Sequence, residues 1–227
     1  MTADDGFDLD RAYSVVTPED NRRLYAEWAA TYDETFVASH GYVYHQSVVA
    51  ALLRRERPAG AVLDVGCGTG VVGEELARWG VGEIDGIDLS PEMLGVAAAK
   101  RADDGRAIYR RLIAADLTAS VDIADSSYAG VVSAGTFTHG HLGPEPLTEL
   151  VRMAAPGAVL AIGINTDHFT SAGFAAWFEI ATSNGWINDL ELVESPIYDA
   201  DRYEASDAAT QASTVSSVAL FQRSRPG

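Results

Sequence analysis

Three alternating glycines constrain this 227-residue chain more than any other feature. Gly66, Gly68 and Gly70 directly follow the apolar run 61–65, which is typical of a strand buried on both faces. Glycine allows positive φ and lets a ligand touch the backbone. A helical pattern follows, and a helix N-terminus favours a carboxylate or phosphate group. The segment therefore predicts a strand, a ligand-binding turn and a helix.

The rest of the chain alternates strands and helices. Strands are predicted at 83–89, 111–115, 128–134 and 158–164, and helices at 72–79, 91–102, 144–154 and 171–184. Because these strands are apolar, we expect a mostly parallel sheet covered on both faces. Segments 189–195 and 214–223 predict an antiparallel C-terminal hairpin. The expected fold class is α/β, a doubly wound, seven-stranded, Rossmann-like sheet that binds ligands at the carboxyl ends of its strands.

The segment before the first strand is helical in character. Residues 17–20 read Thr-Pro-Glu-Asp, a capping hydroxyl followed by a proline and two acids, which predicts a helix start. Leu24, Trp28 and Tyr32 recur at a spacing of four and give this helix one apolar face. A second helix is expected at 42–57. We therefore expect residues 1–58 to form a helical lid and residues 59–227 to form the core of a single domain.

Charge and composition exclude several classes of partner. The chain carries 33 acidic and 16 basic residues, a net charge of −17, so it repels nucleic acid and anionic membranes. No apolar run approaches the ~18 residues of a membrane span, and the acidic N-terminus is no signal peptide. Cys67 is the single cysteine, which excludes an internal disulfide. We expect a cytoplasmic protein without nucleic-acid or membrane partners; its oligomeric state stays open.

An acidic residue follows the glycines at a spacing that is typical of nucleotide-binding sites. Asp88 ends the second strand, eighteen residues after Gly70, close to the ~20 expected for an acid that binds a ribose diol. One interpretation is a dinucleotide fingerprint, Gly68-x-Gly70-x-x-Gly73, which would indicate an NAD(P)-dependent oxidoreductase. That frame begins two residues late and leaves Gly66 and Cys67 unexplained.

The longer string from Asp64 to Gly70 resembles the class I S-adenosylmethionine-dependent methyltransferases, whose motif is an acid, one residue and G-x-G-x-G. The resemblance extends to Asp116, placed where that family has an acid near the adenine amino group, and to Pro156-Gly157, the family's turn into its fifth strand. It covers about 61–164. It implies S-adenosyl-L-methionine as the cofactor.

The same resemblance implies roles for single residues. The glycines pass close to the methionine and ribose parts, Asp64 orients the loop or the amino group, and Asp88 accepts both ribose hydroxyls. Cys67 packs within the loop. The residues expected at the cofactor are Asp64, Gly66, Cys67, Gly68, Gly70, Asp88, Leu89, Met93, Asp116, Leu117, Trp28 and Tyr32.

Candidates for the reaction lie after the fourth strand. An acceptor that loses a proton needs a base, and imidazole titrates near neutral pH. His139 is the first candidate and His141 the second, although either could merely hydrogen-bond the loop backbone. Tyr32 is a further catalytic candidate, through the resemblance by which an aromatic ring closes over the cofactor. His139-x-His141 offers two metal ligands, but no third is spaced to join them, so we expect no metal.

Local motifs narrow the acceptor. Residues 133–136 lack the Asn/Asp-Pro-Pro-aromatic motif of enzymes that methylate DNA bases or protein glutamine, and this loop lacks the carboxylates of the metal-dependent catechol type. Trp28 and Tyr32 resemble the entry segment of small-molecule methyltransferases, whose aromatic rings close over the cofactor. With the loop 135–141 they resemble the group named after the Williams–Beuren syndrome region.

These resemblances imply methyl transfer to oxygen or nitrogen of a small molecule. Two alternatives stay open, a nicotinamide-dependent oxidoreductase and an S-adenosylmethionine-binding protein without transferase activity. Further residues that could face the acceptor are His40, Tyr44, His45 and His168.

Overall fold

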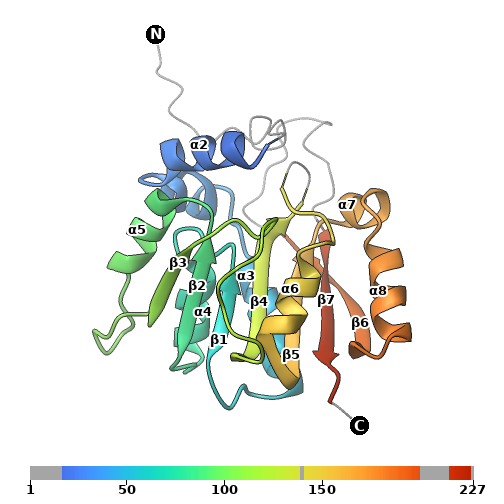
Figure 1. Cartoon of the computed structure of the whole chain (residues 1–227). Coiled ribbons are helices and arrows are strands. Elements are labelled where there is room, and N and C mark those ends of the chain that lie inside the picture. Colours follow the sequence, from blue (N-terminus) through green and yellow to red (C-terminus); the bar gives the residue numbers. More distant parts are fainter. Residues whose placement is uncertain (1–16, 139–140, 200–214, 226–227) are drawn as a thin grey trace.

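A computed structural model describes residues 17–138, 141–199 and 215–225 of the chain. Its strands form one sheet in the order β3-β2-β1-β4-β5-β7-β6 (Figure 1). Their bounds are Val62–Val65 (β1), Ile84–Asp88 (β2), Arg111–Ala114 (β3), Tyr128–Phe137 (β4), Ala154–Ile164 (β5), Ile187–Pro196 (β6) and Val215–Arg223 (β7). Strands β1 to β5 are parallel, and β7 pairs antiparallel with both β5 and β6. The predicted doubly wound, seven-stranded fold with an antiparallel hairpin is confirmed.

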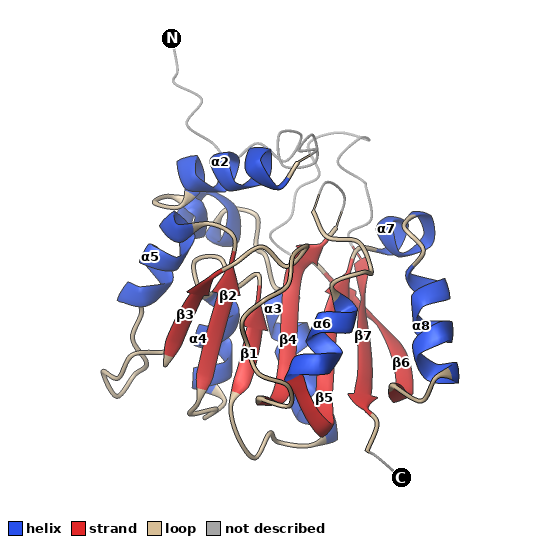
Figure 2. Cartoon of the chain, in the orientation of Figure 1, coloured by secondary structure: helices blue, strands red, loops and turns tan. Residues whose placement is uncertain are grey.

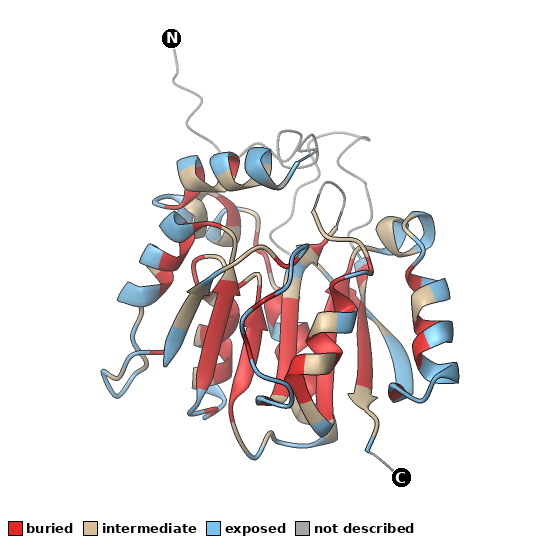
Figure 3. Ribbon diagram, in the orientation of Figure 1, coloured by how far each residue is buried: buried red, intermediate tan, exposed pale blue. Residues whose placement is uncertain are grey.

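Successive side chains of each strand point alternately into two hydrophobic cores, one on each face of the sheet. In β1, Val62 belongs to one core and Leu63 to the other. In β4, Val131 and Val132 divide in the same way. Successive strand side chains point to opposite faces, so strands that are apolar throughout must be covered on both sides. Figure 3 shows the central strands buried and the outer helix surfaces exposed.

Helices cover both faces of the sheet (Figure 2). One core contains residues of α3 (Tyr44–Arg55), α4 (Val71–Arg78) and α5 (Pro91–Ala99). The other contains residues of α6 (Leu147–Met153) and α8 (Phe174–Ser183). The connection from β3 to β4 adds Val121 and Ile123 to this second core.

Two predicted helix starts are confirmed by their caps. Thr17 precedes α2 (Pro18–Trp28), and its hydroxyl accepts a hydrogen bond of 3.1 Å from the Asp20 N–H. Ser90 precedes α5, and its hydroxyl accepts one of 3.2 Å from the Met93 N–H. Each cap satisfies a backbone donor that has no partner within its own helix.

The two helices before β1 lie in different parts of the fold, one on a face of the sheet and one at the strand ends. Helix α3 packs on β4 and β5 and buries Val48, Val49 and Leu52 completely. Helix α2 lies across the carboxyl ends of the strands (Figure 1). The π-helix η1 (Asp33–Ala38) follows α2 and was not predicted. Of the segment expected to form the lid, α2 therefore lies over the strand ends, whereas α3 is part of a layer that covers the sheet.

Two details differ from the sequence prediction near the fifth strand. Strand β5 begins at Ala154, and Pro156-Gly157 forms an irregularity within it, because the pairing with β4 shifts between Tyr128 and Gly130. A short helix, α7 (Thr166–Ser171), precedes α8 and was not predicted.

None of the helices within the described ranges has the length and apolar character that a membrane span requires.

Candidate functional site

A cleft opens at the carboxyl ends of β1, β2 and β4, below α2. Its open volume is about 1090 Å³. Most of the predicted site residues line it, namely Tyr32, Gly66, Cys67, Gly68, Asp88, Leu89, Met93, Asp116, Leu117 and His141. The structure thus brings together residues that are up to 109 positions apart in the chain, from Tyr32 to His141.

The glycine loop turns directly above β1. Gly66 has φ +64°, and a Cβ there would lie 2.0 Å from Oγ1 of Thr136, so the loop and the end of β4 can touch only at a glycine. Gly68 has φ +50°, and a Cβ there would meet nothing within 4 Å. Since Gly68 also lines the cleft, its backbone is open to a ligand.

Asp88 connects the loop to the second strand. One carboxylate oxygen accepts the Gly68 N–H at 2.8 Å and the other accepts the Ser90 N–H at 2.8 Å. Burial raises the pKa of Asp88, and the hydrogen bonds from Ser90 and Gly68 lower it in part. A carboxylate oxygen has two lone pairs, so each oxygen can accept a further hydrogen bond from a ligand in the cleft.

The other predicted acids behave differently. Oδ1 of Asp116 accepts hydrogen bonds from the backbone N–H and the hydroxyl of Thr118, at 2.8 and 2.7 Å, and the residue lines the cleft. Asp64 is fully buried and is not among the lining residues. Its Oδ2 accepts a hydrogen bond of 2.6 Å from the Tyr109 hydroxyl, and its Oδ1 has no hydrogen-bond partner among the described residues. Burial raises the pKa of Asp64 to about 7, with Asp88 adding to the shift.

Tyr109 also explains the third glycine of the dinucleotide-type spacing. A Cβ on Gly73 would lie 2.4 Å from the Tyr109 ring, so this glycine makes room for that side chain. Gly70, at φ +96°, precedes α4 and also faces the Tyr109 ring rather than the cleft. No local sequence pattern predicts a role for Tyr109, because its contact with Asp64 spans 45 positions.

Cys67 and Trp28 take packing positions. Burial raises the pKa of the Cys67 thiol, with the charges of Asp64 and Asp88 adding to the effect, so the thiol stays protonated. A Cβ on Gly86 would lie 2.8 Å from Sγ of Cys67, which shows how closely the loop packs on β2. Trp28 is buried beside Leu24 and is not among the cleft-lining residues.

The α2 helix contributes a tyrosine that the sequence analysis did not single out. Tyr25 lines the cleft, and its Oη lies 3.1 Å from Nε2 of His141. The two rings meet edge to face with their centres 5.6 Å apart. Tyr32 lies next to them, and burial raises the pKa of its phenol well above the ordinary value. A phenol of this kind remains protonated at neutral pH.

The remaining histidines divide as follows. His139, the first candidate base, lies outside the described residues. Nε2 of His168 lies 2.9 Å from the Leu142 carbonyl, so this ring holds the loop after β4. His45 is buried in α3 and lines a different hollow beside η1, and burial lowers its pKa to about 4. His40 follows η1, where its Nδ1 lies 3.1 Å from the Ser39 hydroxyl.

A polar network that was not predicted links the π-helix to the glycine loop. Asp33 accepts a hydrogen bond from the Thr69 hydroxyl and pairs with Lys100, which also pairs with Glu74. Lys100 is the single lysine of the chain.

Within the described residues, no group of three or more His, Cys, Asp or Glu side chains could hold a metal ion.

Comparison with known proteins gives a consistent result. Residues 62–157 match the family described as a methyltransferase domain. A ubiquinone biosynthesis O-methyltransferase of Xanthomonas axonopodis pv. citri is 36% identical over 127 residues, which cover 53% of this chain and 49% of the relative. The chain thus spans about half the length of this curated relative.

Solved structures share the fold at low identity. One is a chain of the complex between the Haloferax volcanii Trm112 methyltransferase activator and a candidate methyltransferase, with a TM-score of 0.62, 20% identity and coverage of 91% of this chain and 98% of that one. Another is the N-methyltransferase NodS of Bradyrhizobium japonicum WM9 with bound S-adenosyl-L-homocysteine, with a TM-score of 0.54, 19% identity and coverage of 80% and 86%. The match of residues 62–157 to a methyltransferase domain agrees with the predicted class I methyltransferase, and the solved structures confirm the fold. The assignment to the Williams–Beuren group stays a prediction.

Proposed function

We propose that this chain is an S-adenosylmethionine-dependent methyltransferase that acts on oxygen or nitrogen of a small molecule. One observation carries the proposal: the open backbone of Gly68 and the carboxylate of Asp88 are joined by a hydrogen bond of 2.8 Å at the floor of the cleft. A cofactor with a ribose diol and an amino-acid tail needs both an acceptor for its hydroxyls and a backbone that it can approach closely.

The cleft residues divide between the parts of such a cofactor. Asp88 would accept the ribose hydroxyls with the lone pairs that its two backbone hydrogen bonds leave over. Leu89, Met93 and Leu117 would flank the adenine ring, with Asp116 near the amino group. Asp64 would act through Tyr109 and the loop, because its side chain does not reach the cleft.

When bound, S-adenosyl-L-methionine supplies an activated methyl group. The protein then has to align the acceptor and exclude water, more than it has to provide strong acid or base. Residues 17–43 would form the lid for this purpose, with Tyr25 and Tyr32 as its inner surface. Helix α3 was also expected in the lid. It would instead join residues 59–227 as part of the core.

The proton of the acceptor would pass to the pair formed by His141 and Tyr25. Their separation of 3.1 Å holds the imidazole at the edge of the cleft. Tyr32 would close over the cofactor as a neutral ring, since its pKa is raised. The relationship to a ubiquinone biosynthesis O-methyltransferase supports a small-molecule acceptor.

Calorimetry separates this proposal from the alternatives. We expect saturable binding of S-adenosyl-L-homocysteine and no binding of NAD or NADP. The reverse result would contradict the proposal and favour the oxidoreductase. Binding of S-adenosyl-L-homocysteine without methyl transfer to any member of a small-molecule acceptor library would favour a non-catalytic binding protein.

A further inference from the structure

A second hollow continues from the cofactor cleft toward β5 and β7. The space that it encloses, including the part open to solvent, is about 620 Å³. The cleft and this hollow share Tyr25, Tyr32, Tyr42, Gly135 and His141. An occupant of the hollow would therefore meet the cofactor cleft at the His141–Tyr25 pair. We call this hollow the aromatic chamber, after its rings Tyr25, Tyr32, Phe36, Tyr42, Phe137 and Tyr198.

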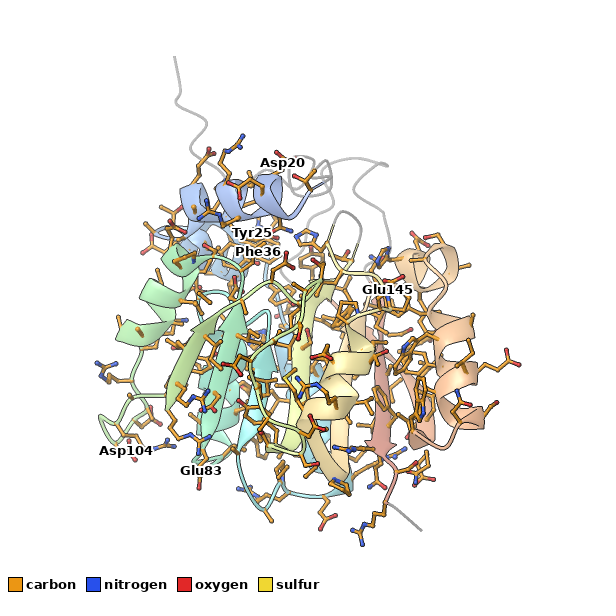
Figure 4. All side chains as sticks on the ribbon, viewed as in Figure 1. Asp20, Tyr25, Phe36, Glu83, Asp104 and Glu145 are labelled. Carbon is orange, nitrogen blue, oxygen red and sulfur yellow. The ribbon has the colours of Figure 1, made fainter. Side chains whose placement is uncertain are left out.

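The rings of the chamber form a connected wall. Phe36 lies 5.1 Å from Tyr32, 5.1 Å from Tyr42 and 6.4 Å from Tyr198, measured between ring centres. The side chains of Tyr25, on α2, and Phe36, on η1, lie at the same end of the sheet (Figure 4). Aromatic pairs are stabilised by offset or edge-to-face contacts at 4.5–7 Å, by about 0.5–1.5 kcal/mol beyond the area they bury. Such a wall favours a flat ring over a saturated one of equal size.

The wall also selects against charge. Among the described residues that line the chamber, none is Asp, Glu, Lys or Arg. Two hydroxyls of the wall are engaged with the protein: the Tyr44 hydroxyl donates to the Ser217 carbonyl at 2.7 Å, and the Ser216 hydroxyl to the Ile164 carbonyl at 2.6 Å. A carboxylate would lose its hydration here without a cationic partner from these residues. An ammonium group would meet the positive charge of the cofactor in a medium of low dielectric constant.

The reaction end of the chamber indicates the reacting group. His141 and Tyr25 lie where the chamber joins the cleft. An imidazole is a much weaker base than an alkoxide, so it assists a phenol, with a pKa near 10, far better than it assists an aliphatic alcohol. We infer that the acceptor is a neutral, flat aromatic molecule that carries a phenolic hydroxyl. This inference rests on the proposed methyltransferase function.

The step balances without a further reactant. The phenolic oxygen forms a bond to the methyl carbon while the bond from that carbon to sulfur breaks and its electron pair stays on sulfur. The hydroxyl proton passes to the His141–Tyr25 pair and from there to water. The products are an aryl methyl ether, S-adenosyl-L-homocysteine and one proton.

A matched series of probes tests the inference on the full chain saturated with S-adenosyl-L-homocysteine. The probes are 2-naphthol, its carboxylate-bearing analogue 3-hydroxy-2-naphthoate, its aminomethyl analogue and the saturated decahydro-2-naphthol. We expect 2-naphthol to bind at least about tenfold more tightly than the carboxylate and the decahydro compound, which corresponds to about 1.4 kcal/mol. The aminomethyl analogue is compared in turnover with S-adenosyl-L-methionine, because only that cofactor carries the sulfonium charge, and we expect it to be methylated more slowly than 2-naphthol. With S-adenosyl-L-methionine in place of the product, mass spectrometry should detect the methyl ether.

Several results would overturn the inference. Equal or tighter binding of the carboxylate, or equal methylation of the aminomethyl analogue, would show that the chamber accepts charge. Equal binding of the decahydro compound would show that the rings do not select flat molecules. If S-adenosyl-L-homocysteine binds but 2-naphthol does not, the inference is wrong and the proposed function stands. If S-adenosyl-L-homocysteine itself does not bind, both are wrong.

A variant locates the binding to the chamber. Phe36→Leu removes one ring and keeps an apolar side chain, and we expect it to weaken 2-naphthol binding at least about fivefold, as the loss of aromatic contacts implies. Trp79→Leu is the control, since Trp79 is 52% exposed at the end of α4, outside the chamber. If Phe36→Leu binds 2-naphthol as the parent protein does, the probe lies elsewhere. If this variant does not fold, the probe series on the parent protein decides alone.

Discussion

Asp33 joins the π-helix to the glycine loop through Thr69. Its Oδ1 accepts a hydrogen bond of 2.5 Å from the Thr69 hydroxyl, and its Oδ2 lies 2.7 Å from Nζ of Lys100. Thr69 lines the cofactor cleft, whereas Phe36, on the same π-helix as Asp33, lines the aromatic chamber. One carboxylate therefore connects the element that faces the acceptor with the loop that faces the cofactor.

Removal of this carboxylate should weaken cofactor binding. A hydrogen bond to a charged group contributes about 1.5–3 kcal/mol, but the Asp33 side chain is 37% exposed, so solvent reduces the value. We expect Asp33→Ala to raise the dissociation constant of S-adenosyl-L-homocysteine about fivefold, as about 1 kcal/mol implies. Calorimetry measures it, with Glu34→Ala, an exposed acid one position later, as the control. An equal loss in both variants would contradict a specific role of Asp33.

This link also shows where sequence reasoning reached its limit. The sheet, its order of elements and most of the cleft residues could be predicted, because apolar strands, helix caps such as Thr17 and Ser90, and glycine spacing are local signals. Asp33 and Thr69 lie 36 positions apart, and no local pattern relates them. The π-helix that carries Asp33 has no cap hydrogen bond from a side chain, so its start left no signal in the sequence.

The same limit applies to the candidate residues of the reaction. Leu24, Trp28 and Tyr32 share the spacing of one helix face, which predicts a packing role, whereas the resemblance to small-molecule methyltransferases placed Trp28 at the cofactor. In the structure Trp28 packs inward beside Leu24, while Tyr25, three positions earlier, contacts His141. The periodicity identified the apolar face, but it could not show which aromatic side chain lies nearest the cleft.

Asp88 should contribute more to cofactor binding than any exposed acid. Its replacement by alanine removes the acceptor of the Gly68 and Ser90 N–H groups together with the acceptor proposed for the ribose hydroxyls. We expect Asp88→Ala to weaken binding of S-adenosyl-L-homocysteine by about 1–3 kcal/mol. Asp122→Ala, an exposed acid in the connection from β3 to β4, should bind as the parent protein does. Unchanged affinity of Asp88→Ala would show that the ribose lies elsewhere.

Substitution of two glycines of the loop should affect different properties, the stability of the fold in one case and cofactor binding in the other. Both have positive φ, which costs a residue with a side chain of the order of 1–3 kcal/mol. A Cβ on Gly66 would in addition clash with Thr136, whereas one on Gly68 meets only open space. In urea unfolding we therefore expect Gly66→Ala to lose the more stability. Gly68→Ala should remain folded and bind S-adenosyl-L-homocysteine more weakly, and parent-like binding by this variant would contradict a cofactor contact at Gly68.

His141 and Tyr25 should affect turnover rather than cofactor binding. General base catalysis contributes about 10²–10⁴-fold, so His141→Ala should lower kcat within that range and leave the dissociation constant of S-adenosyl-L-homocysteine unchanged. Tyr25→Phe removes the hydroxyl that lies 3.1 Å from Nε2 and should lower kcat less. A parallel His139→Ala variant compares the two histidines. If it alone loses turnover, His139 is the base and His141 is structural.

Asp64 should give the protein a pH-dependent stability. Its pKa is raised from 3.8 to about 7 by burial and by the charge of Asp88, while the Tyr109 hydroxyl lowers it in part; the Cys67 thiol lies nearby and stays protonated. Between these two values the folded chain keeps a proton that the unfolded chain has released, so the free energy of unfolding falls as the pH rises toward 7. Asp64→Asn keeps an acceptor for Tyr109 and does not titrate. Urea unfolding without cofactor from pH 5.5 to 8, above the pI near 4.5, should show a shallower fall for Asp64→Asn than for the parent protein or for the exposed control Asp122→Asn. Equal slopes in all three proteins would show that Asp64 is ionised throughout this range.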